Sequence, residues 1–157
     1  MENIPDWAAF EADRLKSFKR WPFKKGPCNP VQMAEAGFYF IGSKSEPDLA
    51  RCYVCCKELD GWEEHDNPWL EHKKHAPKCP YVLLDKKPAD LTVKDMYTLE
   101  AERMKRVLVM RHEAQVKTLN EIKACVLEEL DKLTNKGGKD NRKRSTRPAS
   151  KRSSRKD

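Results

Sequence analysis

Four residues constrain the fold of this chain most, because their spacing is that of metal ligands. Cys52 and Cys55 are followed by His72 and Cys79 in the pattern C-x2-C-x16-H-x6-C. A close cysteine pair on a turn, completed by a histidine and a cysteine further along, is typical of a tetrahedral zinc site. A disulfide pair, or cysteines buried as small apolar side chains, is the alternative. The sequence predicts one structural zinc ion held by these four residues.

Composition favours one compact core with long polar extensions. The chain has 157 residues, of which 38% are hydrophobic and 36% are charged, so we expect a single core of modest size. A structural zinc ion would add folding free energy on the order of 10 kcal/mol to so small a core. We expect no membrane span, since no stretch approaches the ~20 apolar residues that one needs. The first residues do not resemble a signal peptide, so an oxidising compartment is not indicated.

The positive charge is concentrated at one end of the chain. Residues 136–157 contain ten Lys or Arg and two Asp, whereas the other 135 residues contain 22 basic and 23 acidic side chains. We expect this tail to be disordered. It suits nuclear import or sequence-independent contact with DNA. The rest of the chain, with one acidic residue in excess, offers no basic face for nucleic-acid recognition.

Short elements are expected before residue 85. Asn29-Pro30 is typical of an N-cap followed by proline at the first helical position, and it opens a helix over 31–36 that Gly37 ends. Three short strands are predicted over 38–41, 51–54 and 57–62. Asn67-Pro68 introduces a second helix, which carries His72.

A single long helix is expected after residue 88. No Gly or Pro lies between Pro88 and Gly137. Thr92 is a predicted N-cap and Gly137-Gly138 a predicted end, which gives a helix of about 65 Å. So long a helix cannot bury its apolar stripe on a small domain, so we expect another chain to cover it. A solvated helix held by charge pairs is the alternative. The predicted interface consists of Met104, Leu108, Leu119, Ile122, Val126, Leu130 and Leu133.

Further residues surround the four ligands in a recognisable order. They are Gly37-Phe38, the segment 48–55 (DLARCYVC), Leu59, Trp62, the segment 66–68 (DNP), Glu71-His72 and the segment 77–79 (PKC). With them, residues 10–84 resemble a baculoviral inhibitor-of-apoptosis repeat, or BIR domain. One such repeat joined directly to a long helix is similar to the single-repeat members of that family. The resemblance implies an α+β fold: a small zinc domain with a three-stranded antiparallel sheet and short helices, then one long C-terminal helix.

The predicted organisation therefore has four parts. An N-terminal segment covers residues 1–9, the BIR zinc domain 10–88, the long assembly helix 89–135 and the disordered basic tail 136–157. A closed set of three cysteines and one histidine leaves no coordination position for a catalytic water, and no nucleophile–base pair stands out in the sequence. Too few cysteines and histidines remain for a RING finger. The protein is predicted not to be an enzyme.

The BIR resemblance implies a surface groove beside the third strand, which holds a peptide with a small, free N-terminal residue. Asp60 and Asp66 would receive the α-ammonium group, and Leu59 and Trp62 would wall a pocket. Residues 59–62 would offer a strand edge for backbone pairing. The alternatives are that Trp62 is a core side chain and that the two aspartates are solvated turn residues.

The single-repeat members imply a more particular ligand for this groove. In them it holds a core histone tail phosphorylated on its third residue, a threonine marked at mitotic centromeres. By this resemblance Lys57 and His75 would contact the phosphate, which suits their charge. Glu46 would contact the arginine at the second position of the tail.

The same resemblance implies partners for the long helix. It would bundle with helices of borealin and the inner centromere protein, and so deliver Aurora kinase to chromosomes. A homodimer through the region joining domain and helix is also implied, with Pro88 standing where an aromatic side chain is expected. Its apolar candidates are Trp7, Phe10, Leu91, Val93 and Met96.

Two functions compete at this point. The first is a non-catalytic mitotic adaptor, located in the nucleus, at centromeres, at the spindle midzone and in the cytoplasm, with an accompanying anti-apoptotic role. The second is a caspase-directed inhibitor of apoptosis that binds caspase-pathway proteins with small N-terminal residues in the BIR groove. A nucleic-acid-binding zinc protein driven by the basic tail is disfavoured, because the tail alone carries the positive charge.

Overall fold

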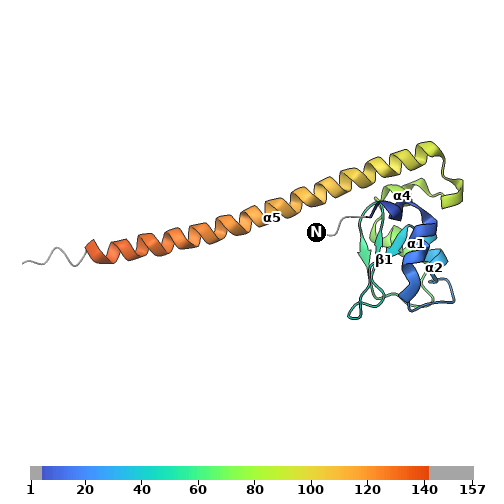
Figure 1. Cartoon of the computed structure of the whole chain (residues 1–157), viewed down its shortest axis with the longest axis horizontal. Helices are drawn as coiled ribbons and strands as arrows, with labels where there is room; N and C mark the ends of the chain where they lie inside the picture. Colours follow the sequence, from blue (N-terminus) through green and yellow to red (C-terminus); the bar gives the residue numbers. More distant parts are fainter. Residues whose placement is uncertain (1–4, 142–157) are drawn as a thin grey trace, which may run out of the picture. The chain divides into compact units, whose positions relative to one another are not determined.

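The computed structural model describes residues 5–141, with side chains to residue 135. The chain divides into two compact units, the first ending at Arg111 and the second beginning at His112. Figure 1 shows the sheet and short helices of the first unit and the long helix α5. Within the described residues, no helix is both long and apolar enough to cross a bilayer.

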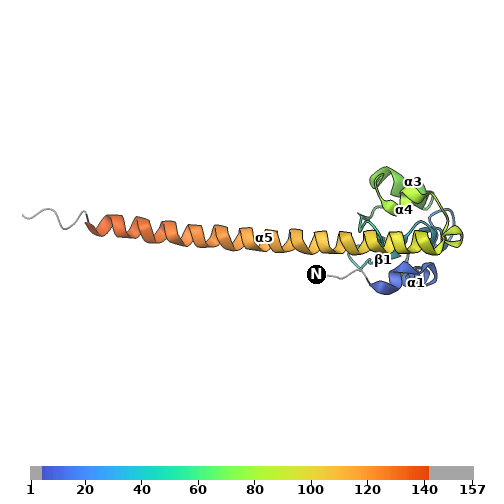
Figure 2. The same cartoon turned by 90° about the horizontal axis from the view of Figure 1, so that it is seen from above.

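The chain alternates short helices with a small sheet before α5 begins. In Figure 2, α3 and α4 lie to one side of the first turns of α5, and α1 lies to the other. The elements, with η for a 3-10 helix, are η1 (Asp6–Ala9), α1 (Glu11–Ser17), η2 (Phe18–Arg20), α2 (Pro30–Glu35), β1 (Phe38–Phe40), β2 (Ala50–Cys52), β3 (Glu58–Leu59), α3 (Pro68–His75), α4 (Pro80–Leu84), η3 (Pro88–Asp90) and α5 (Val93–Asn141).

The three strands form one antiparallel sheet in the order β1-β2-β3. Phe38 pairs with Cys52, and Ala50 pairs with Leu59. The third strand is shorter than the prediction over 57–62, because the chain turns away at Gly61, where φ is +70°. Glycine adopts this left-handed conformation without a steric penalty. The strand edge expected over residues 59–62 is therefore limited to its first residues.

The helix starts confirm the capping predictions. The Asn29 side chain accepts hydrogen bonds from the backbone N–H groups of Val31 and Gln32, and Asn67 caps α3 in the same way. At α5, Thr92 Oγ1 accepts from Asp95 N at 3.2 Å, while Asp95 Oδ2 accepts from Thr92 N at 2.9 Å. This reciprocal pair is a capping box, which satisfies backbone donors left free at a helix start.

The core of the first unit is aromatic and includes one buried arginine. Trp21 is 1% exposed and packs edge-on against Phe18 and Trp62. Arg14, also 1% exposed, donates to the carbonyl oxygens of Ala34, Ala8 and Ala9 at 2.9 to 3.0 Å. Its guanidinium lies 4.4 Å from the centre of the Tyr53 ring. Arg14 therefore joins α1 to η1, to α2 and to the turn after β2.

The first turns of α5 belong to the first unit. Leu99 is 2% exposed, and Val107 and Met110 pack against the same core. Arg103 bonds to Glu100 and, at 3.0 Å, to Asp6. These residues recur on one face of the helix, as expected for a helix laid along a core. The compact unit is therefore larger than the predicted domain over 10–88. Ala8, which precedes the predicted domain, and Leu99, which follows it, are both buried in the core.

The predicted stripe on α5 is exposed. Its seven apolar side chains, from Met104 to Leu133, are each 50 to 65% exposed. The predicted end of α5 near residue 135 is wrong, since the helix continues through Gly137 and Gly138 to Asn141. A glycine costs only about 1 kcal/mol in a helix and does not have to end it. The rest of the predicted basic tail, residues 142–157, lies outside the described residues.

Candidate metal centre and peptide groove

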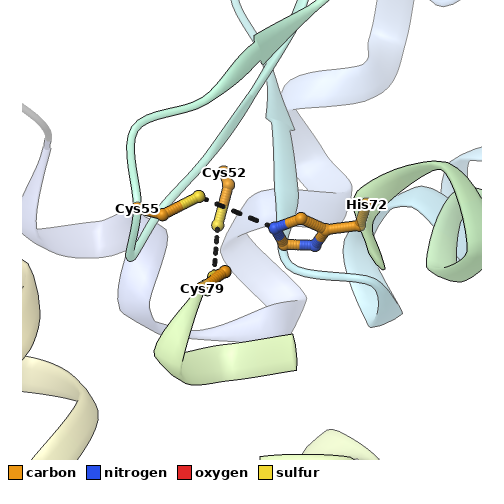
Figure 3. A group of neighbouring side chains, drawn as sticks. All are labelled: Cys52, Cys55, His72 and Cys79. Carbon is orange, nitrogen blue, oxygen red and sulfur yellow. Dashed lines mark hydrogen bonds between the residues drawn. The ribbon is translucent and has the colours of Figure 1, made fainter. Parts of the chain in front are cut away.

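The four predicted ligands converge in the structure. Figure 3 shows Cys52, at the end of β2, and Cys55, in the turn after it, facing His72 on α3 and Cys79 at the start of α4. Their ligand atoms all lie within 4.8 Å of one another. All the cysteines are free thiols, so the disulfide alternative is wrong.

The distances fit one zinc ion. Cys52 Sγ lies 3.9 Å from Cys79 Sγ, and Cys55 Sγ lies 3.7 Å from His72 Nε2. A tetrahedral ion with zinc–sulfur bonds of about 2.3 Å separates its sulfur ligands by about 3.8 Å. The donor set, three thiolates and one imidazole, is a structural zinc set with no open position. The centre holds one zinc ion that joins β2, α3 and α4.

The backbone prepares His72 for this role. His72 Nδ1 lies 2.8 Å from the carbonyl oxygen of Ala36, to which it donates its proton, so Nε2 points at the cysteines. Such a hydrogen bond fixes both the tautomer and the ring orientation of a ligating histidine. Phe38 packs against the imidazole, with ring centres 4.6 Å apart.

The charges of the metal-free cluster depend on the same contacts. Burial acts to lower the pKa of His72, but hydrogen bonds with Cys55 and Cys79 outweigh it and raise that pKa to about 9. Burial raises the pKa of Cys52. Hydrogen bonds with Cys52 and Cys55 lower the pKa of Cys79. The metal-free cluster therefore holds an ion pair between His72 and a thiolate, and zinc must displace the imidazole proton to bind.

A groove of about 360 Å³ lies beside β3. Five of the seven residues predicted to bind a peptide line it: Leu59, Asp60, Trp62, Asp66 and His75. The other lining residues are Gly61, Glu63, Glu71 and Lys74. The groove is therefore mainly acidic, as a site for an α-ammonium group requires.

Both alternatives for the groove residues hold in part. Trp62 is 6% exposed, packs edge-on against Phe38, and donates from its indole to the carbonyl oxygen of Leu59 at 3.1 Å. Its backbone N–H donates to Asp48 Oδ2 at 2.8 Å, so it does not present a free donor. Asp66 Oδ2 accepts from Glu63 N at 2.8 Å, which is turn chemistry. Trp62 is thus both core and groove wall.

Two predicted contacts lie outside this groove. Lys57 lines a separate cavity, next to Cys55 and Cys56. Glu46 lies in the loop between β1 and β2, where its backbone carbonyl accepts from Ser43 N.

Sequence reasoning missed Glu71, which pairs with both basic side chains in the groove, Lys74 and His75. Its carboxylate lies 3.2 Å from His75 Nε2 and 3.1 Å from Lys74 Nζ. The spacing of these residues on α3, three and four positions apart, is the signal that could have revealed the pairs.

A third cavity, of about 670 Å³, contains most of the predicted dimer residues. Phe10, Leu91, Val93 and Met96 line it together with Tyr97. Trp7 is not among its lining residues and instead packs edge-on against Tyr39, with ring centres 5.6 Å apart. Phe10 is 56% exposed and Tyr97 75% exposed, so this apolar surface is open in the single chain.

Comparison with known proteins matches this zinc domain to one family. The sequence profile described as BIR, Inhibitor of Apoptosis domain, matches residues 14–83. Baculoviral IAP repeat-containing protein 5 of Rattus norvegicus is 38% identical, over 82% of this chain and 92% of the rat protein. The protein of that name from Cavia porcellus is 40% identical, over 76% of this chain and 85% of its own length. Baculoviral IAP repeat-containing protein 5.2 of Xenopus tropicalis is 44% identical, over 65% and 67%.

The chain therefore belongs to the baculoviral IAP repeat family, the class that a BIR fold around one zinc centre defines. Its similarity is to the survivins, as the relatives named repeat-containing protein 5 are known, and it extends over most of both chains. The resemblance inferred from the sequence motifs is thereby confirmed.

Proposed function

We propose that the protein is a non-catalytic adaptor of the chromosomal passenger type. Its acidic groove binds the free N-terminus of a histone tail phosphorylated on its third residue, at mitotic centromeres. The observation that supports this most is the joint placement of Asp60, Asp66 and His75 in one groove walled by Leu59 and Trp62. Two carboxylates suit an α-ammonium group, and an imidazole beside them suits a phosphate two residues along the peptide.

The exposed stripe of α5 supports the assembly part of the proposal. Its side chains from Leu119 to Leu133 are half or more exposed, as expected of a helix that buries its apolar face in a bundle with other chains. The partners would be helices of borealin and the inner centromere protein, through which Aurora kinase is anchored for chromosome segregation and cytokinesis. This proposal places the protein in the nucleus, at mitotic centromeres, at the spindle midzone and in the cytoplasm.

A second function has its own support in the groove. Glu71 already pairs with both His75 and Lys74, and Lys57 lines another cavity. An acidic groove whose cations are neutralised suits an unphosphorylated peptide with a small N-terminal residue, which is the ligand of a caspase-directed inhibitor of apoptosis. An anti-apoptotic role can accompany the adaptor role, since both use the same carboxylates.

Peptide titration separates the two functions. Zinc-loaded protein is titrated with histone-tail peptides that carry or lack phosphate on the third residue. The adaptor function predicts a phosphate-dependent gain of about tenfold, or 1.4 kcal/mol, which His75→Ala abolishes. Lys73→Ala is the matched control, because Lys73 is exposed and does not line the groove. Acetylation of the peptide N-terminus should remove binding altogether. Equal binding with and without phosphate would favour the caspase-directed function.

A further inference from the structure

A second cavity in the first unit, of about 750 Å³, is cationic. Its walls come from the turn after β2, the loop between α3 and α4, and the first turns of α5. The charged residues that line it are Lys57, Glu58, Lys78, Glu102, Lys105 and Arg106. This cavity is distinct from the acidic groove, with which it shares no lining residue.

Ion pairs within the cavity leave three cations uncompensated. Glu58 pairs with Arg51, and Glu102 pairs with Lys105 at 3.5 Å. Lys57, Lys78 and Arg106 form no ion pair with any residue that the structure describes. A zinc ion with three thiolates and a neutral imidazole has a net charge of −1, so neutralising it uses only one of the three cations. An excess of positive charge remains in a concave site, where it attracts anions more strongly than on an open surface.

The floor of the cavity is apolar. Val54 is 1% exposed and Cys56 8% exposed, and Ala76, Pro77, Pro80 and Val109 line the cavity with them, next to the zinc ligands Cys55 and Cys79. An apolar floor rimmed by three cations fits a ligand that carries both negative charges and a small apolar side chain.

We propose that this cavity is a docking site for an acidic segment of a partner polypeptide, with its carboxylates or phosphates on Lys57, Lys78 and Arg106 and a small apolar side chain on Val54 and Val109. The site is open to a partner at the same time as the acidic groove. It would select a different peptide, because the charge preferences of the two surfaces are opposite. The proposal does not depend on which ligand the acidic groove takes.

The test is a titration of full-length, zinc-loaded protein with a fluorescent peptide of alternating Glu and Ala, at physiological and at high salt. Charge reversal at the cavity, in the double variant Lys78→Glu/Arg106→Glu, is expected to weaken binding about tenfold or more, since attraction becomes repulsion at two positions. The control variant Lys73→Glu/Lys94→Glu has the same net charge and changes two exposed lysines that do not line the cavity. Because the two double variants have the same net charge and the same tail, any binding of the peptide to the basic tail is equal in both. The control variant is expected to bind the peptide in the cavity as tightly as the wild type.

A neutral variant guards against damage to the zinc centre. Val109→Trp fills the cavity without changing charge, and it should weaken binding while zinc content and melting temperature stay as in the wild type. The same peptide with phosphoserine in place of glutamate distinguishes phosphate from carboxylate as the preferred anion. Equal loss in the cavity and control double variants, or full binding by Val109→Trp, would overturn the proposal. So would amide NMR shifts that spare Val54, Ala76 and Val109.

Discussion

The two units of this chain bury their apolar side chains very differently. In the first, Trp21, Phe38 and Leu99 are at most 2% exposed, and a four-ligand metal centre joins the sheet to two helices. In the second, Leu119, Ile122 and Leu133 on α5 are 55 to 65% exposed. Apolar side chains thus stabilise the first unit within one chain, while those of the second unit stay exposed within the described residues. We therefore expect the first unit to be stable alone, and the proposed assembly would cover the second.

Removing zinc should have the largest effect, and it should be confined to the first unit. Chelation, or Cys79→Ser, is expected to cost on the order of 10 kcal/mol of folding free energy and to abolish the near-ultraviolet circular dichroism of the aromatic core. Cys125→Ser is the control, because this exposed cysteine is not part of the cluster. A metal-free protein that kept its aromatic signal would contradict a structural role for zinc.

Zinc affinity should rise with pH. The pKa of His72 is raised to about 9 in the metal-free cluster, so its proton stays bound below that pH and must be released when zinc binds. This proton alone should change the affinity about tenfold per pH unit below pH 9 and should cease to matter above it. Competition with a chromophoric chelator across this range measures the slope. A flat profile would mean that neither the imidazole nor the thiols release a proton when zinc binds.

The buried arginine should come next. Arg14→Met removes a cation and the guanidinium donor from the carbonyl oxygens of Ala34, Ala8 and Ala9, the first two of them buried contacts, which should cost about 3 kcal/mol or more. Lys16→Ala, two positions along α1 and exposed, should change stability by less than about 0.5 kcal/mol. Urea unfolding monitored by Trp fluorescence compares the two. Similar midpoints would mean that water replaces the guanidinium.

Two leucines on α5 give the most direct comparison between the units. Leu99→Ala should cost about 3 kcal/mol, because Leu99 is 2% exposed in the core. Leu119→Ala, with 64% of the side chain already exposed, should cost less than about 0.5 kcal/mol in the isolated chain. Co-purification with partner helices should show the opposite order, with the larger effect at position 119. There Leu119→Lys is expected to abolish binding. An equal loss of stability in both alanine variants would show that the second unit has a core of its own.

The smallest effect is expected at the start of α5. Thr92→Ala removes the side-chain acceptor for Asp95 N and should cost about 1 kcal/mol. Thr92→Ser keeps that acceptor and should be close to neutral. Thermal unfolding resolves the two variants if they are measured side by side. Equal melting temperatures would mean that packing, and not the Thr92 cap, determines where α5 begins.

Local features could be predicted from the sequence because neighbouring residues determine them. The ligand spacing predicted the zinc centre, and the caps at Asn29, Asn67 and Thr92 follow from side chains that reach backbone groups two or three residues away. The antiparallel sheet and the groove were predicted from the resemblance to BIR domains. The spacing of the ligands alone does not predict them.

Features that depend on packing between distant segments were not predicted. Nothing near Arg14 in the sequence indicates that its guanidinium reaches Ala34. Lys57 was expected in the acidic groove, but it lines a cavity that α5 helps to form through Arg106 and Val109. The face of α5 that packs on the core, with Leu99 and Val107, was overlooked because the exposed stripe is the longer apolar pattern.

Hydrogen exchange compares the two units within one chain. Amides are followed by mass spectrometry in the free protein and after addition of borealin and inner-centromere-protein helices. We expect strong protection in the core around Trp21 and Leu99 of the free protein and rapid exchange over residues 112–135. The added helices should slow exchange over 112–135 and leave the zinc centre unchanged. Strong protection of residues 112–135 in the free chain, or no change there on adding the helices, would show that the second unit does not bury its apolar face in an assembly.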